Sequence, residues 1–185
     1  MTKTTLTCST IDLVHLPAGF GCEEFWMSTT PVTEQQWADV MTSSIGLTDT
    51  IATKRPKTGV TLQEAIEFCK RLGPDFHLPT EMEWCRAAGI EPERDKLDQY
   101  AVFNASFGSL SQAVCPEVGT KLPNEYGLFD MRGLCWEMAL TLDAYVICGG
   151  GWHLNGNYAR SANRYEDAPG HINDLVGFRV VKKGG

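Results

Sequence analysis

The chain has 185 residues, of which 43% are hydrophobic and 21% are charged, and its formal net charge is −7. This composition is typical of one globular domain with a sizeable core, so we expect a single domain over residues 1–185. Residues 149–185 carry five Lys or Arg against three Asp or Glu, which leaves the rest of the chain acidic. An acidic body offers no favourable field to a phosphate backbone, and this argues against a nucleic-acid partner.

Neither a membrane span nor a signal peptide is predicted. No stretch approaches the roughly 20 apolar residues that a membrane-spanning helix needs. Residues 1–6 contain one lysine and no apolar region, unlike a secretory signal. We therefore expect synthesis in the cytoplasm, while display on a virion or at a surface stays open as a destination.

Three helices are predicted from their N-terminal capping boxes. Thr33, Thr61 and Thr80 are each followed three residues later by Gln or Glu, and then by apolar residues at helical spacing. Gly73-Pro74 is expected to end the second helix, and Gly89 the third.

Three strands are predicted where short apolar runs are bounded by Gly or Pro: Ile11–Leu16, Tyr145–Cys148 and residues 177–181. Much of 90–125 and nearly all of 153–176 are expected to form loops. Helices early in the chain and strands at both ends favour an α+β fold, with a few helices packed on a small mixed or antiparallel sheet.

Cysteine is frequent in this chain. The seven cysteines are odd in number and none forms a CxxC pair, which argues against a structural zinc site. Without a secretory signal we expect reduced, buried thiols that pack as small apolar residues.

Several motifs in order resemble the formylglycine-generating-enzyme type of the C-type-lectin-like fold, and together with the first strand they span residues 11–181. These motifs lie at residues 25–37, 76–84, 124–137, 149–152, 159–161 and 177–180. Within them, Gly127 and Gly133 suit tight turns and Trp136 is expected to anchor the core. Glu137 could be a catalytic carboxylate, but we favour a buried acceptor for backbone or arginine donors.

The metal sites implied by the resemblance lack their ligands here. Catalytic members of that family hold copper with two cysteines shortly after a Gly-Gly-x-aromatic motif, and residues 152–160 contain no cysteine. The family usually has an asparagine calcium ligand where this chain has Leu134. The histidines that an iron site would need show no helical ligand spacing: His15, His77, His153 and His171. We expect no metal and no cofactor. An oxygen-dependent metalloenzyme and a calcium-dependent lectin of the same fold are the alternatives.

The C-terminal motifs resemble more specifically the variable proteins of diversity-generating retroelements. The shared frame is Gly-Gly-Gly-Trp at 149–152, Ala-Arg-Ser-Ala-Asn-Arg at 159–164 and Gly-Phe-Arg-Val at 177–180. That family diversifies adenines in Asn codons, from which Trp, Gln, Glu, Lys and Met cannot be reached. Among residues 153–158 and 165–176 only Glu166 belongs to this set, against about three or four expected from average composition.

The resemblance implies a monomeric, non-enzymatic recognition protein with a variable segment at 149–181, whose ligand is a protein or a cell-surface molecule. Tyrosine and asparagine are typical of antibody loops, although asparagine also serves in ordinary turns. The expected ligand-binding residues are His153, Leu154, Asn155, Gly156, Asn157, Tyr158, Tyr165, Asp167, Ala168, Gly170, His171, Ile172, Asn173 and Asp174. The residues expected to support them from beneath are Trp152, Arg160 and Arg164, and Arg160 and Arg179 are interpreted as internal hydrogen-bond forks.

Overall fold

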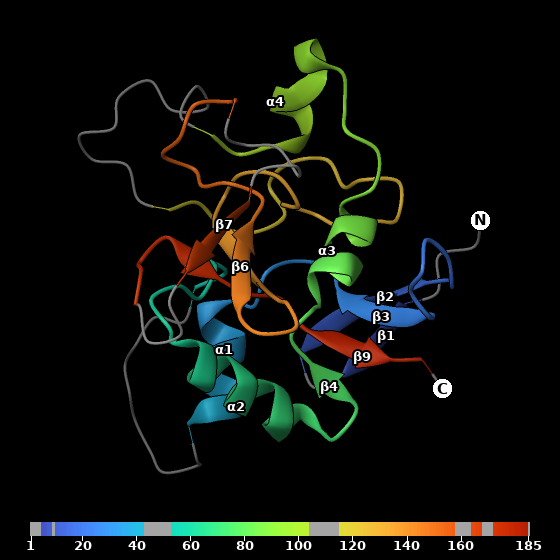
Figure 1. The fold of residues 1–185 in the computed structure, drawn as a ribbon. Helices are drawn as coiled ribbons and strands as arrows, with labels where there is room; N and C mark the ends of the chain where they lie inside the picture. The colour runs from blue at the N-terminus through green and yellow to red at the C-terminus, as the bar shows by residue number, and fades with distance from the viewer. Residues whose placement is uncertain are drawn as a thin grey trace.

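The computed structural model describes residues 5–8, 10–42, 53–103, 115–157, 164–167 and 172–184, and over these ranges it is an α+β protein with two small sheets (Figure 1). Its helices are α1 Glu34–Met41, α2 Leu62–Leu72, α3 Glu81–Ala88 and α4 Leu97–Tyr100, with a 3₁₀ turn η1 Arg94–Lys96 before α4. Its strands are β1 Thr5–Cys8, β2 Ile11–Leu16, β3 Phe25–Ser28, β4 Phe76–His77, β5 Trp136–Leu140, β6 Tyr145–Cys148, β7 Arg164–Asp167, β8 Val176–Gly177 and β9 Val181–Lys183. The α+β prediction is confirmed.

The three predicted helices begin where their capping boxes place them. The hydroxyls of Thr33, Thr61 and Thr80 each accept the backbone N–H three residues on, and the Gln or Glu at that position accepts the threonine N–H in return. Gly73 and Gly89 follow the last residues of α2 and α3. These boundaries are set by local hydrogen bonds, which explains why the sequence alone predicts them.

The two sheets differ in direction. The five-stranded sheet runs β1-β2-β3-β9-β4 and its pairs are all antiparallel. The four-stranded sheet runs β7-β6-β5-β8, with β8 parallel to β5 and the other pairs antiparallel. The last strand, β9, therefore lies inside the first sheet between β3 and β4.

The prediction of one strand over 177–181 is wrong. Val176–Gly177 is β8 of one sheet and Val181–Lys183 is β9 of the other, and residues 178–180 carry the chain between them. Phe178 and Val180 accept backbone hydrogen bonds from Val32 and Ser28, so the apolar run stays extended but changes partners. A continuous apolar pattern cannot reveal that change.

The expected loops are also interrupted. The edge strand β7 lies inside 153–176, and η1 with α4 lies inside 90–125. Arg164 to Asp167 contain a single aromatic residue and no apolar alternation, so the strand pattern is weak there. The helix α4 is one turn long and has no side-chain cap to announce it.

The four-stranded sheet separates two hydrophobic clusters. Trp136 and Ile147 point to one side, where Phe68 of α2, stacked on Trp37, and Phe178 fill the core. Alternate residues of β5 and β6 point to the other side, where α3 packs through Trp84 on strands of both sheets. This alternation fixes the direction of each side chain on the neighbouring edge strand β7.

The cysteines whose side chains are described form no disulfide: Cys22, Cys69, Cys85, Cys115, Cys135 and Cys148. Cys69, Cys135 and Cys148 are buried as expected, and burial raises the pKa of each thiol. The expectation fails at Cys85, which is exposed on α3.

Candidate ligand-binding face

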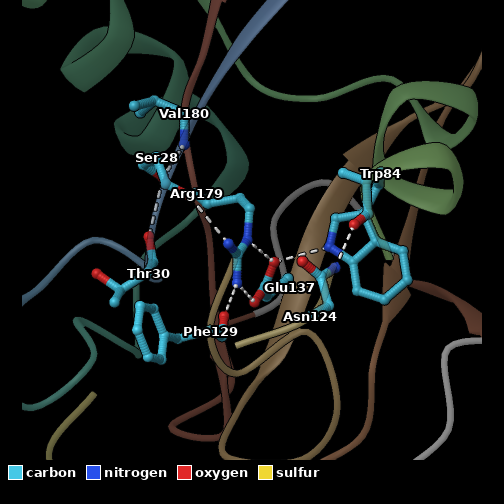
Figure 2. Close-up of polar contacts among 9 residues, drawn as sticks. Ser28, Thr30, Trp84, Asn124, Phe129, Glu137, Arg179 and Val180 are labelled. Carbon is cyan, nitrogen blue, oxygen red and sulfur yellow. Dashed lines mark hydrogen bonds and ion pairs between the residues drawn. The ribbon is translucent and has the colours of Figure 1, made fainter. Parts of the chain in front are cut away.

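A buried ion pair joins the motif at 124–137 to the motif at 177–180 (Figure 2). The guanidinium of Arg179 donates from Nε and Nη2 to the two carboxylate oxygens of Glu137, at 2.6 and 2.7 Å. Trp84 Nε1 donates to the same carboxylate at 2.7 Å from the other side. Arg179 also donates to the carbonyls of Ser28 and Phe129, both at 3.0 Å, and its side chain is 0% exposed.

This arrangement confirms the interpretation of Glu137 as a buried acceptor and of Arg179 as an internal fork. The carboxylate is 1% exposed, and its three short contacts come from a charged guanidinium and an indole N–H. Such a carboxylate has its oxygens engaged within the protein and lies out of reach of a substrate. Glu137 therefore serves the fold and is not placed for catalysis.

A second buried carboxylate lies in the same motif. Asp130 has φ 59° and accepts the N–H of Gly119 at Oδ2, 2.7 Å away, while its Oδ1 is buried with no hydrogen-bond partner among the residues that the structure describes. Burial raises the pKa of Asp130 to about 6, although the Gly119 hydrogen bond opposes the shift. Both carboxylates are desolvated, but the hydrogen bond from Gly119 offsets this cost at Asp130 less fully than the three contacts of Glu137 do.

Residues 153–157, at the start of the predicted loop 153–176, lie against η1 and the segment around α4. Asn155 Oδ1 accepts the N–H of Asn157 at 3.0 Å, which closes a turn within the loop. Asn157 Oδ1 accepts from Arg94 Nη2 at 2.8 Å. A Cβ on Gly156 would stand 3.1 Å from the Phe103 ring, so the backbone approaches closely there. Residues of both segments line a cleft of about 350 Å³.

Two aromatic pairs lie in this part of the molecule, one at β7 and one at the start of the loop. The rings of Trp136 and Tyr165 meet edge to face with centroids 5.2 Å apart, and those of Trp152 and His153 with centroids 6.0 Å apart. His153 Nδ1 is buried and has no hydrogen-bond partner within the described part of the chain, and burial lowers the pKa of this imidazole. Leu154 is half-buried and packs on the core cluster that contains Trp136.

The two sides of β7 face different neighbours. Tyr165 pairs with Ile147 in register, is 49% exposed and points to the side of Trp136. Glu166 is turned the other way and lines a cleft with Glu81 and Met82 of α3. Arg164, on that same side, forms a 2.6 Å ion pair with Glu81. A single edge strand therefore separates a side chain expected to bind ligand from two that face α3.

Residues 172–175, near the end of the predicted loop 153–176, lie against the segment before α2. Asn173 Oδ1 accepts the N–H of Leu175 at 2.9 Å, and the Asn173 carbonyl accepts from Gly59 and Val176. Asp174 is exposed beside Gly59, where a Cβ would stand 2.9 Å from its Oδ1. Ile172 is exposed. The backbone of this turn is thus fixed while Ile172 and Asp174 project.

The structure therefore places part of the predicted site. We define the C-terminal face as the expected ligand-binding residues whose side chains it describes: His153, Leu154, Asn155, Gly156, Asn157, Tyr165, Ile172, Asn173 and Asp174. The backbone of Asp167 lies in β7 opposite Tyr145. The remaining predicted residues lie outside the described ranges: Tyr158, Arg160, Ala168, Gly170 and His171. The roles of all these residues, and of Trp152 and Arg164 as supports, stay predictions.

Sequence reasoning missed the neighbours of this face. Arg94 and Phe103 contact residues 153–157 across more than fifty residues of sequence, and no motif marks either of them. Trp136 was recognisable as a core residue, but its contact with Tyr165 depends on the order of strands in the sheet. Within the described ranges, no group of three or more His, Cys, Asp or Glu side chains is arranged to hold a metal ion.

A family model described as the sulfatase-modifying factor enzyme 1-like domain matches residues 17–184. Among curated proteins, the chain is 29% identical over 153 residues to the serine/threonine-protein kinase pkn1 of Chlamydia pneumoniae. This match covers 70% of the chain and 24% of that relative, so the chain spans about a quarter of its length. In the described ranges, no helix has both the length and the apolar character needed to cross a membrane.

Solved structures share the fold at low sequence identity. Treponema denticola variable protein 1 is 21% identical, with a TM-score of 0.76 and full coverage of both chains. PvdO from Pseudomonas aeruginosa is 19% identical, with a TM-score of 0.78 over 97% of this chain and 98% of that one. The U1 variant of Major Tropism Determinant is 13% identical, with a TM-score of 0.57 over 85% of this chain and 50% of that one. The predicted C-type-lectin-like fold is confirmed.

Proposed function

This chain belongs to the sulfatase-modifying factor enzyme 1-like domain family, and we propose that it is a non-enzymatic member that binds a ligand at a diversified C-terminal face. The diversified segment is 149–181, within a single domain of 185 residues, and the diversifying agent is a retroelement. The ligand class is a protein or a cell-surface molecule. Two proteins of the same fold are named variable protein and Major Tropism Determinant, and these names support a recognition function for this chain.

The alternation across β7 carries the proposal. Glu166 is the one residue in 153–158 and 165–176 that diversified Asn codons cannot produce. Its side chain lies on the α3 side of the strand, whereas Tyr165 lies on the side of Trp136. Glu166, whose codon cannot arise from a diversified Asn codon, thus points away from the proposed face. This is expected if diversification and selection act on Tyr165 and not on Glu166.

The hydrogen bonding of the loops supports the same function. Asn155 and Asn173 each close a turn onto a backbone N–H two residues ahead, so the loop backbone is fixed by short-range contacts. Side chains such as Tyr165 and Ile172 then project without taking part in those turns. A fixed backbone that displays adaptable side chains is what a diversified binding surface requires.

Two randomised libraries test the proposal. The face library varies His153, Asn157, Tyr165, Ile172 and Asp174. A matched control library varies positions on or just after α2: Gln63, Glu67, Lys70, Arg71 and Asp75. Both are displayed and selected against the same panel of purified proteins, with folding checked by thermal melts. We expect folded binders from the face library and none from the control. Equal yields from the two libraries would contradict the proposal.

Two further measurements separate the alternatives. DNA beside the gene should contain a reverse transcriptase and a near-copy of the 3′ end that differs almost only at adenines. Metal analysis of the purified protein should find neither copper nor iron. A stoichiometric amount of either metal would favour the oxygen-dependent metalloenzyme instead, and a calcium-dependent rise in melting temperature would favour the lectin.

A further inference from the structure

An exposed phenylalanine stands at the tip of a strained turn. Gly19 and Cys22 exchange backbone hydrogen bonds of 3.0 Å in both directions, which closes a two-residue turn over Phe20 and Gly21. Phe20 has φ 52° and Gly21 has φ 80°, the positive pair that favours Asn-Gly at these positions. Phe20 is 89% exposed. Folding therefore gains little from this ring and bears the strain of its backbone.

The exposed face of α3 continues this apolar surface. Phe20, Met82 and Ile90 are exposed and line a cleft of about 630 Å³ over the outward side of the helix. Met82 also lines a second cleft, of about 760 Å³, beside Leu142 at the β5–β6 turn. We call the surface formed by Phe20, Met82, Ile90 and Leu142 the α3 flank. Contiguous exposed apolar surface of this kind marks an interaction site.

The charges around the α3 flank are mainly acidic. The carboxylates that line its two clefts are Glu81, Glu125, Asp143 and Glu166. The neighbouring cations are engaged within the molecule, because Arg164 pairs with Glu81 and Arg86 donates to the carbonyl of Pro17. A second copy docked on this surface would bring acidic rims together, which is unfavourable, whereas a basic partner would complement them.

We propose that the α3 flank docks a basic amphipathic segment of another protein. Apolar side chains of that segment fill the two clefts on either side of Met82, and its lysines or arginines meet the acidic rim. Phe20 is the anchor: within the chain its ring meets the guanidinium of Arg86, 5.8 Å from the ring centroid, and a partner that buries the exposed remainder of the ring adds further compensation for the backbone strain. The α3 flank and Tyr165 lie on opposite sides of β7, so a partner docked at the flank leaves the C-terminal face open.

Phe20→Asn separates docking from folding. Asparagine suits a positive φ in a turn, so the variant should melt at the same temperature as wild type or higher. The probe is a fluorescent peptide of alternating leucine and lysine at helical spacing, and its counterpart carries glutamate in place of lysine. By anisotropy, we expect wild type to bind the leucine–lysine peptide and Phe20→Asn to bind it at least about 10-fold more weakly.

Matched controls make the result specific. Met82→Glu should weaken binding of the leucine–lysine peptide like Phe20→Asn, while Tyr165→Ala, on the opposite side of β7, should leave it unchanged. Absence of binding to wild type, equal binding of the glutamate peptide, or an unchanged affinity of Phe20→Asn would each overturn the proposal. Self-association in sedimentation that Phe20→Asn abolishes would overturn it in favour of a second copy. None of these outcomes bears on the C-terminal face.

Discussion

The Glu137–Arg179 network and the C-terminal face satisfy their polar groups in opposite ways. Arg179 donates hydrogen bonds to Ser28, Phe129 and Glu137, which are far apart in the sequence. On the face, Asn155 and Asn173 bond to backbone only two residues away. A change in the network disturbs several segments together, whereas a change in a face loop disturbs one turn. Stability is therefore assigned to the network, and the proposed variability to the loops of the C-terminal face.

The largest effect is expected at Arg179. Arg179→Leu leaves the buried carboxylate of Glu137 without its cation, and we expect a loss of roughly 3–5 kcal/mol in unfolding free energy. Urea denaturation monitored by tryptophan fluorescence measures it. The double variant Glu137→Leu/Arg179→Leu should be more stable than Arg179→Leu alone, because no charge remains unpaired.

The exposed ion pair of Arg164 with Glu81 is the matched comparison for Arg179. Arg164→Leu removes a contact of the same 2.6 Å length from a side chain that is 63% exposed. The expected loss is about 0–1 kcal/mol, because solvent screens an exposed pair. Equal losses for the two arginine variants would mean that burial does not make the Glu137–Arg179 pair more important to stability than the exposed pair.

We expect the unfolding free energy of the protein to depend on pH through the buried Asp130. Since burial raises its folded pKa from 3.8 to about 6, its contribution to stability is fully present below about 3.8 and is lost as the pH rises through about 6. Relative to wild type, Asp130→Asn should therefore gain on the order of 2–3 kcal/mol in unfolding free energy as the pH rises across that window. Urea denaturation at a series of pH values tests this, and parallel curves for the two proteins would refute it.

The smallest effect is expected on the face itself. Tyr165→Ala removes the ring contact with Trp136 from a half-exposed position and should cost about 1 kcal/mol. Tyr165→Phe keeps the ring and serves as the control. Thermal melts of both variants provide the measurement. A loss for Tyr165→Ala as large as that for Arg179→Leu would mean that the face is part of the structural core.

The elements that the sequence predicts well are those fixed by neighbours in the chain. The capping boxes at Thr33, Thr61 and Thr80 lie within four residues, and Ile11–Leu16 and Tyr145–Cys148 are short runs with clear ends. The structure of residues 177–181 could not be predicted in the same way. Their division into β8 and β9 depends on which backbone groups lie across from them, and these belong to distant strands.

The site follows the same rule. The sequence indicates that Glu137 is a buried acceptor, but it cannot select Arg179 as the donor 42 residues away. The positions of loop residues 153–157 were predicted, whereas their packing on Arg94 and Phe103 was not, because α4 is too short to show a helical period. Local patterns thus locate the face, and the fold determines what it rests on.

The position of β9 has a consequence for translation of the gene. This strand lies between β3 and β4, and the residue that anchors the buried network, Arg179, precedes it by two positions. Both are encoded after residues 153–176. A frameshift or stop codon anywhere in that stretch therefore removes an interior strand of the five-stranded sheet and leaves Glu137 without its cation. Only messenger RNAs that keep their reading frame through residues 153–176 yield a chain that can complete its fold. Gene copies with a frameshift or stop codon there yield proteins that do not fold.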